Sequence, residues 1–107
     1  MSRKYGKPDA NHAAIVKALT AAKCDVLDLK AVGNGAPDLL VGSPFYPYRM
    51  FLIEIKDGDK PPSARKLTPD QEVFHSKWRG PVYVVTSVKE ALDVVGFFAV
   101  ESTGSET

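Results

Sequence analysis

The sequence predicts an α/β fold in which a mixed β-sheet is flanked by helices, with the element order α-β-β-β-α-β-α. Two observations lead to this prediction. Two apolar segments separated by a loop indicate an antiparallel hairpin in the first half of the chain. Helix-start signals then stand on either side of a β-branched run, which indicates a strand–helix–strand crossover. A hairpin and a crossover in one sheet require both antiparallel and parallel pairing.

One domain fits the length of 107 residues. We expect a basic arm over residues 1–8, the domain over residues 9–100 and a disordered tail over residues 101–107. The net charge of +1 provides no overall basic excess that would indicate nucleic acid, although local patches matter more than the sum. No apolar run is long enough to cross a membrane, and the single cysteine excludes an internal disulfide. We therefore expect Cys24 to be a small buried residue in a cytoplasmic, reducing setting.

The first helix is expected from Asp9, a capping residue, to about Lys23. Its buried stripe consists of Asn11, Ile15, Leu19 and Ala22, widened by Ala14 and Ala18. The Asn11 side chain either makes a helix-start hydrogen bond or points into a site at that end of the sheet. A strand over residues 25–29 follows, and the glycines and proline of residues 32–37 then form a turn that brings the backbone close to another group.

Residues 38–42 and 50–56 are the two strands of the expected hairpin, and each carries charge within an apolar segment. Isolated charges in such strands are costly unless they are paired or bind a metal. The connection over residues 43–49 is too long for a tight turn. Its aromatic residues and prolines suggest a stiff flap or a partner surface, with solvated loop packing as the alternative.

Strand alternation divides the second strand of the hairpin into two faces. These are Leu52, Glu54 and Lys56 on one side and Phe51, Ile53 and Ile55 on the other. If Gly42 pairs with Met50, Asp38 lies opposite Glu54. Directly opposed Cβ atoms are about 4.5–5.5 Å apart. Two carboxylates at that separation repel each other unless a cation lies between them.

The connection after the hairpin, residues 57–67, is polar and contains a rigid Pro61–Pro62 pair. Its candidate contact residues are Lys60, Arg65 and Lys66. A solvated loop is one interpretation of these cations. Contact with a phosphate backbone is the other, because they follow directly after the charged strand.

The second helix is predicted to begin at Thr68, because Gln71 stands three residues later and completes a capping box. Gln71 therefore has two interpretations, a cap and a site residue. One face of this helix carries Gln71, Phe74, His75 and Trp78. We expect its two large aromatic residues to point inward and its histidine to lie in the core or at the core edge.

Residues 81–86 form a nearly continuous β-branched run, which is typical of a central strand. Ser87 and Glu90 are predicted to form a second capping box, so Glu90 has a structural explanation and is not assigned to a site. The last helix is expected to end at Gly96. The apolar residues 97–100 then pack on the domain or on a partner.

Asp38, Glu54 and Lys56 make up the candidate site. Two carboxylates and the Ile55 carbonyl are hard oxygen ligands suited to Mg²⁺ or Mn²⁺. Such an ion polarises a phosphoryl oxygen and lowers the pKa of a bound water, while Lys56 either orients that water or stabilises the developing charge. This combination indicates phosphodiester hydrolysis. The alternative is a structural ion pair between Glu54 and Lys56, with Asp38 as a turn residue.

The pair Pro37-Asp38, followed by Glu54-Ile55-Lys56, resembles the signature of the PD-(D/E)XK nuclease superfamily. Four segments extend this resemblance to small stand-alone VRR-Nuc domain proteins of phages and prophages. They are residues 36–42, 53–56, 67–71 and 84–91. The resemblance covers nearly the whole chain, from about Asp9 to Gly96. It implies a restriction-endonuclease-like core, a divalent metal ion and DNA as the substrate.

By this match Asp38 and Glu54 become metal ligands and Lys56 becomes the catalytic lysine. Gln71 becomes the glutamine that follows the catalytic strand in this family. The small members are similar to Holliday-junction resolvases and often act as homodimers, so branched or duplex DNA and a second copy are the implied partners. The implied location is the cytoplasm of a bacterial or phage-infected cell. Contact with DNA is assigned to Lys7, Lys60, Arg65 and Lys66.

Asn11 departs from the family pattern. Many members have a glutamate in the first helix that completes the metal site, and Asn11 occupies the matching place as a further candidate ligand. A neutral amide is a poorer ligand for a hard cation than a carboxylate. Two alternatives therefore stay open. One is a DNA-binding or assembly module with weak or no catalytic activity. The other is a purely structural protein, in which residues 97–100 form a dimer contact and the charged residues of the hairpin have no functional role.

Overall fold

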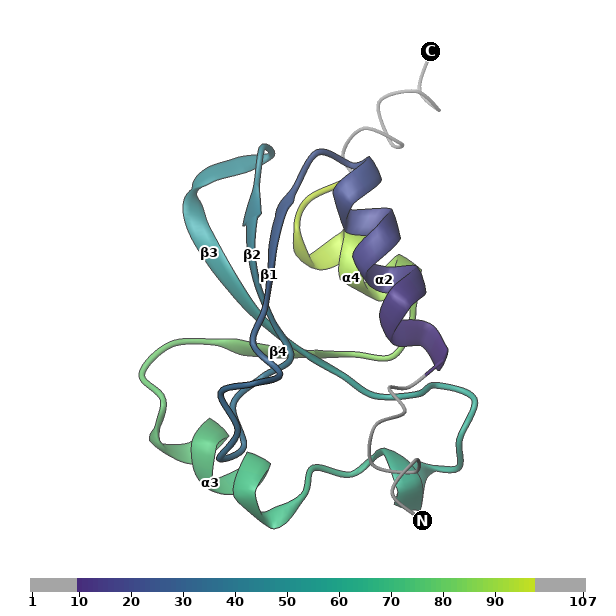
Figure 1. Ribbon diagram of the computed structural model, residues 1–107, viewed down its shortest axis with the longest axis vertical. Coiled ribbons are helices and arrows are strands. Elements are labelled where there is room, and N and C mark those ends of the chain that lie inside the picture. Colours follow the sequence, from purple (N-terminus) through teal and green to yellow (C-terminus); the bar gives the residue numbers. More distant parts are fainter. Residues whose placement is uncertain (1–9, 98–107) are drawn as a thin grey trace.

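Residues 10–97 are described by the computed structural model, which contains a four-stranded sheet and three α-helices over this range (Figure 1). The strands are β1 (Asp25–Asp28), β2 (Leu39–Ser43), β3 (Tyr46–Ile55) and β4 (Val82–Val85). The helices are α2 (Ala10–Ala21), α3 (Pro69–Lys77) and α4 (Val88–Val94), with a short 3-10 helix, η1 (Pro62–Arg65), before α3. The predicted element order is confirmed over these residues, with η1 as an addition.

The sheet is mixed, as predicted. β1 pairs with β2 and β2 with β3 in antiparallel fashion, and β3 pairs with β4 in parallel, so the spatial order is β1-β2-β3-β4. Within the described residues β4 lies at a sheet edge, and its prediction as a central strand is wrong. Its β-branched composition suits any pleated, half-buried surface, and an edge strand also provides one. Val85 is buried, whereas Val84 is 45% exposed.

The hairpin of β2 and β3 is tight, and the long connection expected over residues 43–49 is wrong. Ser43 pairs with Tyr46, which leaves the two residues between them as the turn. The Ser43 hydroxyl explains this geometry. It accepts a hydrogen bond from the Phe45 N–H at 3.0 Å and donates one to the Val95 carbonyl at 2.7 Å. The buried Ser43 side chain thus satisfies one backbone group in the turn and one after α4, so two residues are enough to connect the strands.

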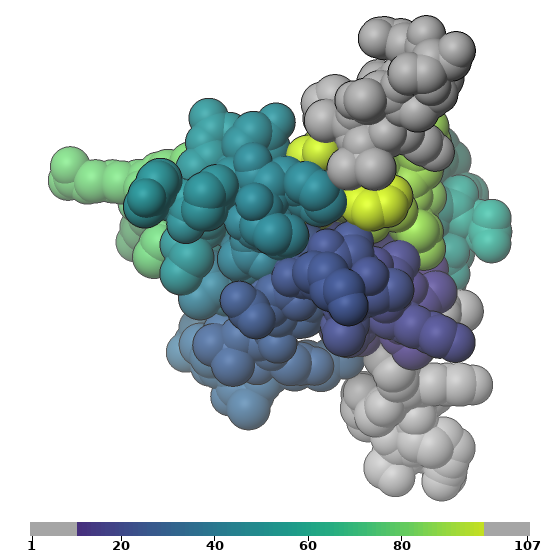
Figure 2. Space-filling view, turned by 90° about the horizontal axis from the view of Figure 1, so that it is seen from above, coloured from purple at the N-terminus to yellow at the C-terminus, as the bar shows by residue number. Residues whose placement is uncertain are grey.

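The hairpin tip packs against the residues that follow α4, next to which it lies in Figure 2. The rings of Phe45 and Phe97 meet edge-on, with centroids 5.7 Å apart. Gly96 has a φ of +93°, and a Cβ added there would lie 2.7 Å from the Tyr46 ring. Phe97, the first residue of the apolar segment predicted at residues 97–100, therefore packs on the domain itself.

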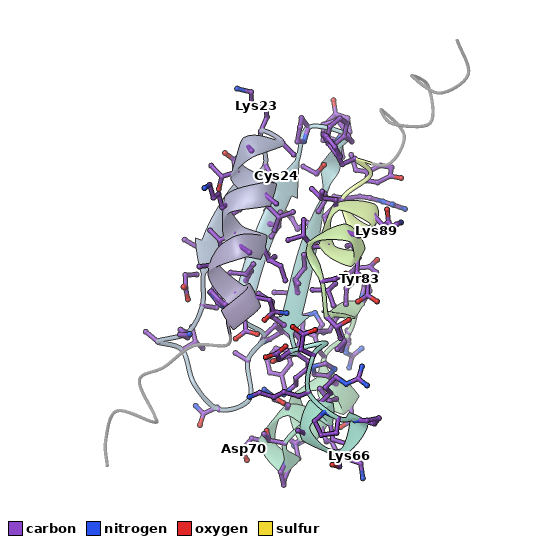
Figure 3. The ribbon with its side chains drawn as sticks, turned by 90° about the vertical axis from the view of Figure 1, so that its right-hand side faces the viewer. Lys23, Cys24, Lys66, Asp70, Tyr83 and Lys89 are labelled. Atoms are coloured by element: carbon purple, nitrogen blue, oxygen red, sulfur yellow. The ribbon has the colours of Figure 1, made fainter. Side chains whose placement is uncertain are left out.

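The core lies between one face of the sheet and the helices α2 and α4, which lie side by side over it (Figures 1 and 3). We name this the inner face and the opposite side the outer face. The buried apolar residues are Ile15, Leu19, Ala22, Cys24, Leu39, Val41, Phe51, Ile53, Ile55, Val85, Ala91 and Val95. The expected burial of Cys24 is confirmed, and this burial raises the pKa of its thiol.

The helix stripe predicted for residues 9–23 is confirmed at Ile15, Leu19 and Ala22. Ala14 is exposed, contrary to the prediction, because its side of the helix faces neither the sheet nor α4. His12 is 9% exposed instead, with its Nε2 3.7 Å from a carboxylate oxygen of Asp28. Val16, which was not part of the predicted stripe, packs against the core, so α2 is held by these apolar contacts and by one polar contact to Asp28.

The outer face is open along most of the sheet and carries α3 at one end (Figure 1). The pairing register aligns Leu27, Leu40, Leu52 and Val82 in one row across the four strands. The next row toward α3 contains Glu54 and, beside it, Val84. Leu27 is 57% and Met50 67% exposed, so much of this apolar surface contacts no other described element.

The turn over residues 32–37 brings the backbone close to another group, as predicted, and the structure identifies that group as the start of α3. Gly35 has a φ of +80°, and a Cβ added at this position would collide with the main chain of Asp70. The connection between β1 and β2 thus supports the start of α3. A glycine is required here both for its conformation and for its lack of a side chain.

The second predicted capping box forms only in half. Ser87 caps α4 by accepting a hydrogen bond from the Glu90 N–H at 3.1 Å. The Glu90 carboxylate does not close the box but binds Thr86, whose N–H and hydroxyl donate to it at 2.6 and 3.0 Å. Thr86 offers this carboxylate two donors, and both bonds hold the end of β4 against α4.

Some predictions concern residues outside the described range. These are the basic arm at residues 1–8, the helix cap at Asp9, residues 98–100 and the tail at residues 101–107. Among residues 10–97 there is no helix with both the length and the apolar character that a membrane crossing requires.

Candidate functional site

The candidate site lies where β2 begins and β3 ends. Gly42 pairs with Met50, which is the register assumed in the sequence analysis, and the same register pairs Leu39 with Ile53. Asp38, the next residue toward the site, therefore lies beside Glu54. Its position is fixed by the Ile55 N–H, which donates a hydrogen bond to Asp38 Oδ2 at 2.7 Å. The start of one strand thus holds a carboxylate against the end of its neighbour.

Glu54 is a buried carboxylate, with only 2% of its surface exposed. Helix α3 covers it at the end of the outer face. The Gln71 amide nitrogen donates a hydrogen bond to Glu54 Oε2 at 2.9 Å, and His75 Nε2 lies 4.0 Å from Oε1. A buried carboxylate is costly without such polar contacts. The burial of Glu54 on the otherwise open face therefore depends on α3.

Gln71 caps α3 and also contacts two residues of the candidate site. Its side-chain oxygen accepts a hydrogen bond from the Thr68 N–H at 2.9 Å, and its own N–H donates to the Thr68 hydroxyl at 3.2 Å, which completes the capping box. The same oxygen accepts a bond from Lys56 Nζ at 2.8 Å. The amide nitrogen of Gln71 donates to Glu54, so this one side chain connects the Glu54 carboxylate to the Lys56 ammonium group. Both groups are thereby bonded to the capped first turn of α3.

His75 joins this group, although its position in the sequence indicated only a core residue or a core-edge residue. Burial lowers the pKa of His75 from its ordinary value, and the positive charge of Lys56 lowers it further. Both effects favour the neutral imidazole, whose Nε2 lies 4.0 Å from Glu54 Oε1. A signal for this residue was present, because His75 follows Gln71 by one helical turn on the same face.

Asn11 connects α2 to the ends of two strands. Its side-chain amide nitrogen donates to the Lys56 carbonyl at 2.9 Å and to the Thr86 carbonyl at 3.1 Å. A glutamate has no donor for either bond. The Asn11 oxygen is buried and finds no hydrogen-bond partner within residues 10–97. The amide at this position thus has a specific function, the bridging of two backbone carbonyls beside the site.

The four residues assigned to DNA contact are not all described. Lys7 lies outside residues 10–97. Lys60 and Lys66 are exposed on the connection between β3 and α3, and Arg65 is half-buried at the end of η1. Figure 3 shows Lys66 and the α3 residue Asp70 at the same end of the molecule. This placement agrees with both interpretations, a solvated loop and a phosphate contact.

Phe74 of α3 and Trp78, the residue that caps the end of this helix, do not enter the core, and the prediction that they point inward is wrong. Trp78 is 48% exposed and stacks on Phe74, with ring centroids 5.2 Å apart and planes at 15°. No residue of α3 is buried. Helix α3 covers only the end of the outer face. Its apolar side chains are therefore not enclosed between two layers of the fold.

The residues here that could hold a hard divalent ion are Asp38, Glu54 and the Ile55 carbonyl. Among residues 10–97 no three histidine, cysteine, aspartate or glutamate side chains are grouped so as to hold a metal. Mg²⁺ does not need such a cage, because one or two carboxylates with water and substrate phosphates complete its shell. The paired carboxylates of Asp38 and Glu54, with the Ile55 carbonyl, are a donor set of that kind.

Comparison of the chain with models of protein families, with curated proteins and with solved structures found no match.

Proposed function

We propose that this protein is a metal-dependent DNA endonuclease that hydrolyses phosphodiester bonds, with a preference for branched DNA such as four-way junctions. The observation that carries the proposal is the Gln71 side chain, which accepts a hydrogen bond from the Lys56 ammonium and donates one to the buried Glu54 carboxylate. Costly buried charges of this kind gather at functional sites. The resemblance of the flanking segments to VRR-Nuc domain proteins supports DNA as the substrate.

Asp38, Glu54 and the Ile55 carbonyl would hold Mg²⁺ or Mn²⁺. When bound, the ion would polarise a phosphoryl oxygen and lower the pKa of a bound water. Lys56 stabilises the negative charge that develops on the phosphate, and Gln71 keeps its ammonium group in position. Lys60, Arg65 and Lys66 contact the DNA backbone, and this contact weakens as the salt concentration rises.

Cleavage assays test the endonuclease. Purified protein is incubated with labelled four-way junctions, flaps and plain duplex in Mg²⁺, in Mn²⁺ or in EDTA. We expect cleavage with either metal and none in EDTA. Lys56→Ala should lower the rate by about 100-fold or more, as loss of one charge-stabilising group does elsewhere, and should leave DNA binding largely unchanged.

Lys89→Ala is the matched control, because Lys89 is an exposed lysine on α4, where it contacts Asp93. This variant should cleave like the parent. A folded parent that cuts none of the three substrates would remove the proposal. Equal rates for the parent and Lys56→Ala would show that the assigned site is wrong.

A second candidate function is a DNA-binding or assembly module without cleavage. The observation that favours it is Asn11, which donates to two carbonyls where an acid would complete a metal site. This candidate predicts junction binding that falls with salt and no strand scission in either metal. The same assays therefore separate the two functions.

A further inference from the structure

The outer face carries a pocket of about 480 Å³ next to the candidate site. We name it the Trp78 pocket; its lining includes Pro37, Leu40, Leu52, Phe74, Trp78 and Arg79. Its volume falls in the range of about 300–1,000 Å³ that is usual for ligand sites. The walls come from the sheet, from α3 and from the turns on either side of them.

The pocket and the candidate site share their structural elements. Leu52 lines the pocket, and Glu54 lies two residues further along the same face of β3. Pro37 lines the pocket and directly precedes Asp38. In the first turn of α3, Gln71 contacts Glu54, and Trp78, which caps the end of this helix, lines the pocket. A ligand that crosses this end of the outer face would reach both places.

The chemistry of the lining fits a flat, aromatic ligand attached to an anion. The Trp78 indole is 48% exposed and is held by its stack on Phe74. Aliphatic side chains of β2 and β3 form the floor, and Arg79 adds a positive charge. Nucleobases stack on aromatic side chains and on guanidinium groups, with little dependence on sequence. Coverage by an apolar protein surface would bury Arg79 without a partner, which is costly.

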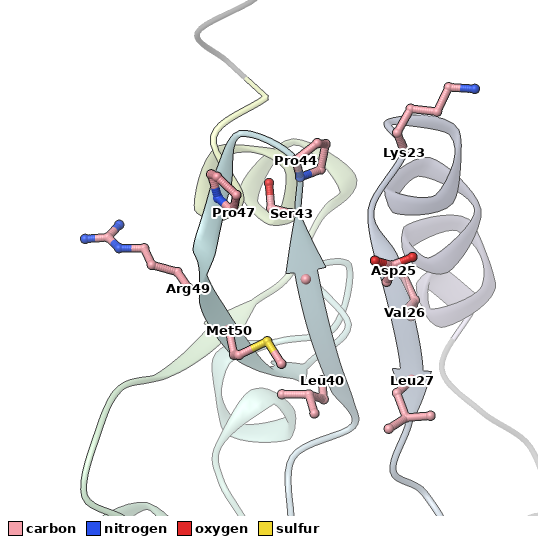
Figure 4. A pocket seen from close by; sticks show the side chains of 11 residues that line it. Lys23, Asp25, Val26, Leu27, Leu40, Ser43, Pro44, Pro47, Arg49 and Met50 are labelled. Atoms are coloured by element: carbon pink, nitrogen blue, oxygen red, sulfur yellow. The ribbon is translucent and has the colours of Figure 1, made fainter.

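A neighbouring pocket of about 580 Å³ lies further along the same face and shares Leu40 and Met50 with the first. Its basic side chains, Lys23 and Arg49, point away from it (Figure 4). Positively charged groups therefore do not converge on a ligand there. The combination of an exposed aromatic ring and a cation distinguishes the Trp78 pocket.

We propose that the Trp78 pocket binds an unpaired nucleobase of the DNA, next to the phosphate that occupies the candidate site. This inference rests on the proposed function, because it takes DNA as the substrate. A paired base is held in the duplex stack and does not reach such a pocket unless it is extruded. The pocket thereby favours DNA that already has an unpaired base, as at a flap or a branch point.

Fluorescence of 2-aminopurine tests this proposal. One probe is a DNA flap with 2-aminopurine at the unpaired position next to the branch, and the other is a duplex with the same base paired. Both are titrated in EDTA, so that the signal does not depend on cleavage. The parent should quench the unpaired probe. Trp78→Ala should lose the quenching and bind the flap about tenfold or more weakly, with a much smaller change for the duplex.

Two further variants sharpen the experiment. Trp78→Phe keeps an aromatic ring and should retain most of the affinity for the flap. Val73→Ala is the matched control, because Val73 is a 51% exposed apolar residue of α3 that does not line the pocket. It should bind both probes like the parent. Equal losses for Trp78→Ala and Val73→Ala, equal losses for flap and duplex, or no quenching by the parent would each overturn the proposal.

The outcome also distinguishes the pocket from the endonuclease. A parent that quenches the flap probe but cuts no DNA would keep the pocket and remove the endonuclease. A parent that cuts branched DNA without quenching would remove the pocket alone. Sedimentation of the parent and of Trp78→Ala identifies another occupant: a dimer that becomes a monomer in the variant would show that a second copy fills the pocket, and would overturn the proposal.

Discussion

The two faces of one sheet differ in what covers them. The inner face is closed by α2 and α4 and holds the apolar core. The outer face is covered by α3 at one end, and there it buries a glutamate beneath a glutamine and a histidine. Strand β3 serves both faces with alternate residues, Ile53 and Ile55 inward and Glu54 outward. Stability and the proposed chemistry therefore depend on neighbouring residues of the same strand.

Ile53→Ala should produce the largest effect on folding, because Ile53 is fully buried at the centre of the inner face. Truncation removes buried methyl groups and leaves a cavity, so the free energy of unfolding should fall by about 2–5 kcal/mol. Urea denaturation followed by circular dichroism measures it. A loss much smaller than this range would mean that the core between the sheet and its helices is less tightly packed.

Asn11→Asp tests the connection between the helices of the inner face and the site of the outer face. The change removes two donated hydrogen bonds and places a carboxylate against two carbonyls, so we expect a loss of about 1–3 kcal/mol in unfolding free energy. Asn34→Asp is the control, since Asn34 lies in an exposed turn with a φ of +56°, which aspartate tolerates. If both variants unfold at the same urea concentration, the bridge by Asn11 contributes nothing.

Leu27→Thr should have the smallest effect. Leu27 lies on the open part of the outer face and is 57% exposed, and threonine suits a strand, so the free energy of unfolding should change by about 0.5 kcal/mol or less. The same denaturation assay compares it with Ile53→Ala. A large loss at Leu27 would show that another molecule, such as a second copy of the chain, covers the outer face under the conditions of the assay.

Local patterns were sufficient for much of the fold. The element order and the capping box at Thr68 follow from signals within a few residues, and both are confirmed. The register that pairs Gly42 with Met50 was an assumption, and the structure shows it. The tight hairpin did not follow, because the bond that supports it joins Ser43 to Val95, 52 residues away. The edge position of β4 did not follow either, because β-branched residues indicate a strand and not its place in a sheet.

For the candidate site, too, the sequence indicated the residues but not the contacts between them. Asp38, Glu54, Lys56 and Gln71 were found from alternation, register and resemblance, and their roles in catalysis stay predictions. The bonds that Gln71 makes to Glu54 and Lys56 depend on where α3 lies, and Gly35 allows that position by its close contact with Asp70. His75 and the exposed Trp78 depend on the same placement.

The sequence by itself determined which side chains share a face of β3, because alternation is a local property of an extended chain. Only the tertiary structure decided that α3 covers the end of the outer face, that Asn11 bridges two strand ends and that a pocket opens beside Glu54. These features join segments far apart in the chain. Their free energies depend on burial and geometry that no short stretch of sequence contains.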